Sequence, residues 1–85
     1  MTVYLALEPA AAREVIQLAR QIGCAVWVGA DAITAEEHCA LTAEGLNLTR
    51  FNYTLSDATS EIIADALSTV REHHPHAIIW VQSLA

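Results

Sequence analysis

The chain has 85 residues, which is enough for one domain with a small core. Its formal net charge is −6, and its only basic residues besides histidine are four arginines. Binding to a phosphate backbone requires clustered basic residues, so direct binding to nucleic acid is not expected. The longest apolar runs are far shorter than the ~20 residues of a membrane span, and no basic segment precedes an apolar one at the amino terminus. We therefore expect one cytoplasmic domain over residues 1–85, with no membrane partner.

The first predicted elements are a strand, a helix and a second strand. Residues 2–7 alternate as a strand does, and apolar residues recur at helical spacing over 9–22. Pro9 suits the first position of that helix, and Gly23 is a natural carboxyl-terminal cap. The β-branched content of 24–29 predicts the second strand.

The segment 34–45 fits two different structures. Thr34 and Glu37 match a capping box, and Gly45 would end a short helix. A strand over residues 38–42 that turns at Gly45 fits equally well. We favour the strand, which makes this segment part of a hairpin.

The remaining elements are a strand, a helix and a strand. Period-two alternation predicts a strand over 46–55. A helix follows over 57–73, capped by Ser56 or Asp57, and a last strand covers 77–81.

The predicted order is therefore β-α-β-β-α-β. This order is similar to the ferredoxin-like plan, an α+β fold of two layers in which an antiparallel sheet carries both helices on one face. The alternative is a small α/β fold with a third short helix at 35–43 and a mostly parallel sheet.

Alternation along three strands predicts an aromatic sheet face. If the aliphatic side chains of each strand face the two helices, the opposite face carries Tyr4, Trp27, Ile78 and Trp80. A bare patch of this kind is unusual on a monomer, because each aromatic side chain buries ~150–250 Å² when it is covered. We expect a second copy of the chain, another protein, a ligand or the folded-back segment 30–46 to cover it.

The middle of the chain is acidic. Between Gln21 and Thr49 there is no lysine or arginine, and the acidic residues are Asp31, Glu36, Glu37 and Glu44. This segment would suit an electropositive partner, or it forms a solvated surface that keeps the protein in solution.

A cluster of histidines at 73, 74 and 76 is the one candidate metal site. Imidazoles bind zinc, copper and nickel, and His74 and His76 flank a rigid proline. The simpler interpretation of His73, His74 and His76 is that they are exposed residues favoured by the carboxyl end of a helix.

No motif in the chain identifies a reaction. Cys24 and Cys39 lack the spacing of a redox or zinc motif and are expected to be free thiols. His38 and Cys39 are adjacent, so their side chains diverge and make a poor nucleophile–base pair. There is no glycine-rich phosphate loop and no nucleophile elbow. We expect no catalytic residue and no cofactor.

These observations favour a non-enzymatic protein that binds other proteins, such as a regulator or inhibitor. It would act as a homodimer or in a hetero-complex, through the aromatic face and the acidic segment. The alternative is a small metal-binding or sensing domain that uses His73, His74 and His76. A third possibility is an enzyme whose pocket carries no recognisable motif.

Overall fold

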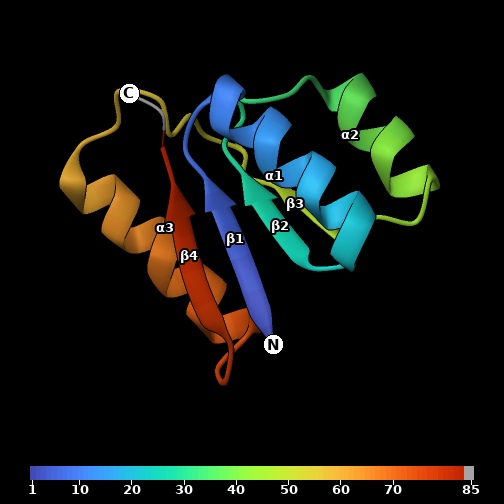
Figure 1. Ribbon diagram of the computed structural model, residues 1–85. Helices are drawn as coiled ribbons and strands as arrows, with labels where there is room; N and C mark the ends of the chain where they lie inside the picture. Colours follow the sequence, from blue (N-terminus) through green and yellow to red (C-terminus); the bar gives the residue numbers. More distant parts are fainter. Residues whose placement is uncertain (84–85) are drawn as a thin grey trace.

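The computed structural model describes residues 1–83 (Figure 1). Strands and helices alternate from Thr2 to Gln82. In chain order the elements are β1 (Thr2–Ala6), α1 (Pro9–Ile22), β2 (Ala25–Val28), α2 (Ala35–Ala43), β3 (Leu48–Arg50), α3 (Ser60–His73) and β4 (Ile78–Gln82). The four strands form one sheet in the order β3-β2-β1-β4, and every neighbouring pair is parallel.

The predicted antiparallel, ferredoxin-like sheet is wrong. The segment 34–45 contains the helix α2 and not the strand of a hairpin, so the structure has three helices, as in the alternative. A helix between each two consecutive strands brings every strand back in the same direction, which makes the sheet parallel. The capping box stabilises the start of α2: the Glu37 amide donates to the Thr34 hydroxyl, and the Thr34 amide donates to the Glu37 carboxylate, both at 3.0 Å.

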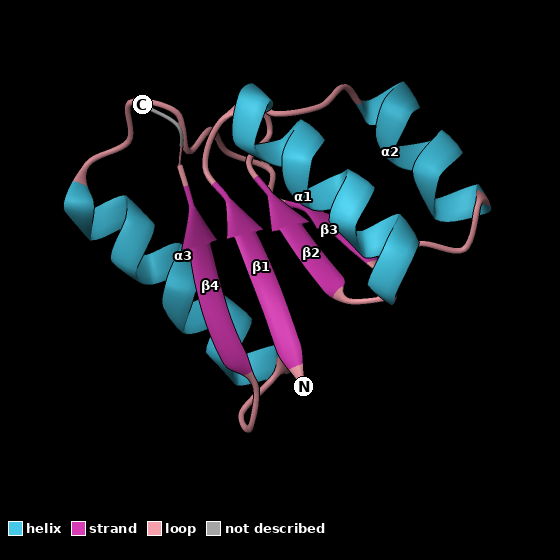
Figure 2. Cartoon of the chain, in the orientation of Figure 1, coloured by secondary structure: helices cyan, strands magenta, loops and turns pink. Residues whose placement is uncertain are grey.

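The connections place helices on both faces of the sheet. Figure 2 shows α1 and α2 on the near face and α3 behind the sheet. From β1 through β3 the chain moves in one direction across the sheet, and α3 then carries it back past these strands to the far side of β1. Because parallel crossovers are right-handed, this reversal puts α3 on the opposite face.

Several element boundaries differ from the sequence prediction. The helix over 9–22 is confirmed, with Pro9 at its start and Gly23 in the left-handed conformation at φ 73°. The strand predicted over 46–55 is much shorter, because only Leu48–Arg50 pairs with β2. Residues 51–59 form an irregular loop, and Thr59, not Ser56 or Asp57, caps α3.

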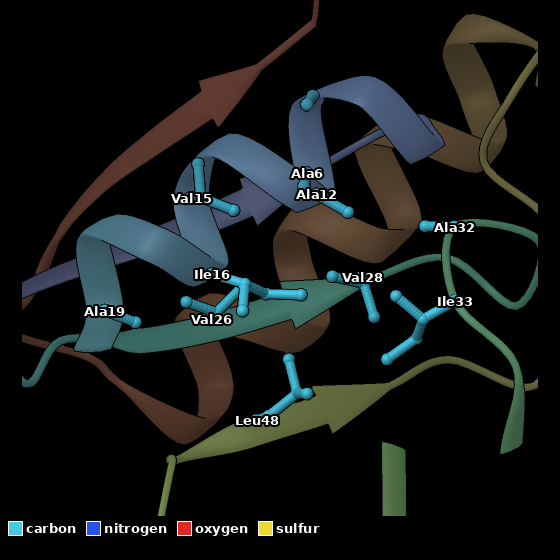
Figure 3. Close-up of a cluster of buried hydrophobic side chains, with 11 residues drawn as sticks. Ala6, Ala12, Val15, Ile16, Ala19, Val26, Val28, Ala32, Ile33 and Leu48 are labelled. Atoms are coloured by element: carbon cyan, nitrogen blue, oxygen red, sulfur yellow. The ribbon is translucent and has the colours of Figure 1, made fainter. Parts of the chain in front are cut away.

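Each face of the sheet has its own apolar core. We call them the α1-side core and the α3-side core. The buried α1-side core (Figure 3) consists of Ala6, Ala11, Ala12, Val15, Ile16, Ala19, Val26, Val28, Ala32, Ile33 and Leu48. The buried α3-side core consists of Val3, Leu5, Ala25, Trp27, Phe51, Leu55, Ala66 and Val70.

The pairing register corrects the predicted faces. Leu5 is the partner of Trp27, and Tyr4 is the partner of Val26, so Trp27 lies on the face opposite to Tyr4. Trp27 is only 6% exposed and belongs to the α3-side core. The prediction had grouped residues by chemical type, but in a sheet covered on both faces each face carries aliphatic and aromatic side chains.

None of the helices formed by residues 1–83 has both the length and the apolar character needed to cross a bilayer.

Candidate protein-interaction site

The strand β4 lies at one edge of the sheet and is unusually exposed. Within residues 1–83 it pairs with β1 alone, and its sequence Ile-Ile-Trp-Val-Gln contains neither a charged residue nor a proline. The exposed fractions are 64% for Ile78, 58% for Trp80 and 43% for Val81. We call these three residues the β4 strip. An apolar edge strand of this kind readily pairs with another chain.

Ile78 and Trp80 of the β4 strip are exposed because the helices on their face of the sheet cover other strands. The apolar side of α1 packs on β1 and β2, and α2 lies over β3 (Figure 1). Three helices on four strands therefore leave the α1-side face of β4 without a helix of its own.

A groove of ≈ 420 Å³ runs between α1 and β4 on this face. Its residues come from both elements and from the neighbouring strand. They are Tyr4, Glu14, Val15, Leu18, Trp80 and Gln82. Two aromatic rings and two aliphatic side chains make this groove chiefly apolar, and Glu14 supplies its one charge.

The backbone of β4 also presents unused hydrogen-bonding groups. The Ile78 amide donates to the Met1 carbonyl at 2.9 Å, and the Gln82 carbonyl accepts from the Leu7 amide at 3.1 Å. Because backbone groups alternate in direction along a strand, Ile79 and Val81 point their N–H and C=O groups away from the sheet. No hydrogen bond within residues 1–83 reaches these outward groups.

The opposite edge of the sheet is protected. The strand β3 has three residues, and its last residue, Arg50, donates hydrogen bonds to the Ile33 carbonyl at 3.0 Å and the Ala30 carbonyl at 2.7 Å. The His38 ring on α2 lies with Nε2 2.9 Å from the Leu48 carbonyl oxygen. A short, charged and covered edge resists pairing with another chain, so β4 is the open edge in the described part of the chain.

The structure brings together three of the four residues predicted for the aromatic face. Ile78, Trp80 and Tyr4 share the α1-side face, because the register pairs Tyr4 with Trp80 and Thr2 with Ile78. Trp27 lies in the opposite core. The sequence prediction missed Val81, whose side chain faces the other way and whose exposure follows from the edge position of β4.

Three of the four predicted acidic residues are engaged within the chain. Glu44 forms an ion pair with Arg20 at 3.2 Å, and Glu37 belongs to the capping box of α2. Asp31 accepts a hydrogen bond from the Leu55 amide at 3.4 Å. Among the residues described, only Glu36 of this group makes no such contact. Three of these acidic residues therefore contribute to local structure, and all four lie at the surface.

Asp31 links the loop after β2 to the loop after β3. Partial burial by itself would raise the pKa of the Asp31 carboxyl. Hydrogen bonds from the Ser56 side chain and from the backbone amides of Asp31, Leu55 and Ser56 outweigh that effect and lower the pKa below its ordinary value of 3.8.

The histidine cluster packs against an aromatic ring. The centroids of the His73 and His74 rings lie 5.1 and 6.1 Å from that of Trp27, and His76 is exposed in the following turn. Within residues 1–83, no three histidine, cysteine, aspartate or glutamate side chains are arranged to hold a metal ion. The His73 and His74 rings thus lie against Trp27.

The two cysteines are free thiols, as expected. Cys24 is half-buried, and burial raises the pKa of its thiol, although a backbone hydrogen bond acts in the opposite direction. Cys39 is exposed on α2. The neighbouring His38 ring is held at the Leu48 carbonyl.

The carboxyl ends of the strands, where open parallel sheets bind ligands, are filled in this protein. The loop 51–59 lies there: Leu55 is 1% exposed, and the Ser56 hydroxyl donates to the Leu7 carbonyl at 3.3 Å. The turn from β1 into α1 contains no glycine, and Pro9 removes an amide that a phosphate would use at the start of the helix. These features disfavour the usual nucleotide site.

A second groove of ≈ 340 Å³ lies between this loop and α3. It is lined by Tyr53, Thr54, Ile62 and Asp65. Burial, and then the negative charge of Asp65, raise the pKa of the Tyr53 hydroxyl, so Tyr53 is a neutral phenol at physiological pH.

Comparison of the chain with family models, with curated proteins and with solved structures gives no match.

Proposed function

We propose that this chain is a non-enzymatic protein-interaction module, of the regulator or inhibitor type, which binds through β4. The observation that carries the proposal is the β4 strip: three large apolar side chains exposed on one uncharged edge strand. Edge strands bind partners by strand addition, in which backbone hydrogen bonds supply affinity and alternate side chains supply specificity.

Two further observations support a binding role. The groove beside β4 has aromatic and aliphatic walls, which suits the side chain of a partner. Three of the four acidic residues and two of the three clustered histidines make contacts within the chain, although most of them lie at the surface. β4 combines exposed apolar side chains with unused backbone hydrogen-bonding groups.

The test compares two substitutions of equally exposed apolar residues. Trp80→Lys places a charge on the β4 strip, whereas Ile22→Lys changes a residue that is 60% exposed at the end of α1 and serves as the control. Each protein is immobilised and exposed to extract of the cells that produce it, and each retained protein is identified and purified. Its affinity for the three chains is then measured directly.

The expected result is a retained protein, whether another chain or a copy of this one, whose affinity falls by more than an order of magnitude with Trp80→Lys and is unchanged by Ile22→Lys. Equal affinity for all three chains, or no specific binding to any of them, would contradict the proposal.

A further inference from the structure

We infer that β4 binds a second copy of the chain, so that two sheets join at antiparallel β4 strands into one continuous sheet of eight strands. This inference rests on the proposed function, since it assigns an occupant to the same surface. Three observations support it: the pattern of backbone groups, the exposed side chains and the charge.

The backbone pattern of β4 is self-complementary. A two-fold axis through Trp80 and perpendicular to the sheet sets Ile79 of one copy opposite Val81 of the other. Both residues point their backbone groups outward, so each such pair exchanges two hydrogen bonds and the interface gains four. Every outward N–H and C=O of Ile79 and Val81 then has a partner.

This register is preferred over the one that is shifted toward the start of the strand. An axis through Ile79 would require Ala77 to pair as well, but the Ala77 amide already donates to the His74 carbonyl at 3.2 Å. Residues 75–77 form a turn, and the strand begins at Ile78. The axis through Trp80 pairs all five residues of β4 with their counterparts and leaves that turn intact.

The side chains on the α1-side face fit the same register. Trp80 meets its own counterpart in a pair that shares no backbone hydrogen bonds, which is the closer type of cross-strand pair, with Cα atoms ~4.5 Å apart. The exposed part of one such ring amounts to on the order of 100 Å². Ile78 adds a similar area on the same face of each copy, and Val81 adds a smaller area on the α3-side face. Over both copies these side chains expose several hundred Å², less than the ~1,200–2,000 Å² typical of specific interfaces, so we expect a weak dimer.

Charge favours a copy over an electropositive partner. The chain carries a net charge of −6, yet β4 contributes none of it. A partner selected by charge would contact acidic residues, whereas an uncharged strand suits an identical uncharged strand. Repulsion between the two acidic bodies weakens such a dimer at low ionic strength, so added salt strengthens it. The opposite salt dependence is expected for an electropositive partner.

The first experiment measures the mass of the purified chain by sedimentation equilibrium, from low micromolar to high micromolar concentration, at low and high salt. The expected result is a monomer–dimer equilibrium that salt shifts toward the dimer.

Trp80→Lys should abolish the dimer. Val81→Pro should also abolish it, because it removes an outward amide that β1 does not use. Ile22→Lys should leave the dimer unchanged. Near-ultraviolet circular dichroism of the buried Trp27 verifies that each variant is folded.

The second experiment tests the register by disulfide cross-linking in a background that lacks Cys24 and Cys39. Trp80→Cys should form an intermolecular disulfide readily, since Cα atoms ~4.5 Å apart are within bonding geometry. Ile78→Cys is the matched control, because the counterpart of Ile78 in the dimer is Gln82, and the two introduced thiols would lie too far apart to bond.

The outcomes separate the two proposals. A chain that stays monomeric at all concentrations overturns the dimer, while loss of another bound protein with Trp80→Lys would still support the proposed function. A dimer that survives both β4 substitutions overturns the dimer interface proposed here. Cross-linking of Ile78→Cys as fast as Trp80→Cys overturns the register.

Discussion

Gly29 lies directly after β2, under the loop that fills the carboxyl ends of the strands. A Cβ atom at this position would lie 2.9 Å from the Leu55 backbone nitrogen and 3.0 Å from the Leu55 Cβ. Backbone atoms cannot move aside as the end of a side chain can, so Gly29→Ala must displace the loop. We expect a loss of about 1–3 kcal/mol in the free energy of unfolding, measured by urea denaturation.

Thr54→Ala is the control for this substitution, because it changes an exposed residue of the same loop. It should alter stability by less than about 0.5 kcal/mol. If Gly29→Ala were as stable as the parent, the close approach of Leu55 to Gly29 would not constrain residue 29.

Asp31 makes the stability of the folded chain depend on pH in the acidic range. Its pKa is lower in the folded chain than the ordinary 3.8 of the unfolded one. The contribution of Asp31 to stability is therefore complete above pH 3.8 and is lost as the pH falls through the folded value. Asp31→Asn keeps an oxygen that can accept from the Leu55 amide but cannot titrate.

We expect the loss of stability between neutral pH and pH values below 3.8 to be smaller for Asp31→Asn than for the parent chain. Urea denaturation at both pH values measures the difference. If both proteins lost the same stability at low pH, the hydrogen bonds from the loop 51–59 would not stabilise the ionised Asp31 carboxylate.

At the scale of elements, α2 depends on its cap more than the other helices do. It has no buried residue, and its main link to the core is the half-buried Leu41. Thr34→Ala removes one side of the capping box and should cost about 0.5–2 kcal/mol in the stability of this helix. Amide hydrogen exchange should therefore become faster in α2 and stay unchanged in α1, where apolar packing dominates.

Thr34→Ser keeps the capping hydroxyl and serves as the matched variant. It should retain the slow exchange of α2. If amide exchange in α2 became equally faster in Thr34→Ser and Thr34→Ala, the cause would be the loss of the Thr34 methyl group and not the loss of the capping hydrogen bond.

The two edge strands show what a single element can and cannot reveal. The sequence of β4 predicts a strand, and it also shows that the strand carries no charged residue. Only the order β3-β2-β1-β4 shows that this strand has one neighbour. An apolar run of the same composition in the centre of a parallel sheet would be ordinary core.

At the scale of the whole molecule, the connection after β3 has the largest effect. It reverses the direction in which strands are added, and this reversal leaves β4 beside β1 with α3 on the opposite face. The β4 strip and the groove beside it follow from this arrangement. The proposed dimer is in turn the simplest way to extend a sheet that has one open edge and one protected edge.

The sequence by itself determined most of the elements. Proline and glycine at the ends of 9–22 and period-two alternation in β1 are local signals, because their causes lie within a few residues. The capping box at Thr34 is also a local signal, but the prediction favoured a strand for 34–45, and the structure shows the helix α2 there. Strand direction, pairing register and the division of apolar side chains between two cores are set by contacts between distant segments. Trp27 and Trp80 illustrate the difference: each lies in an apolar strand, but the register buries one in the α3-side core, and the edge position exposes the other.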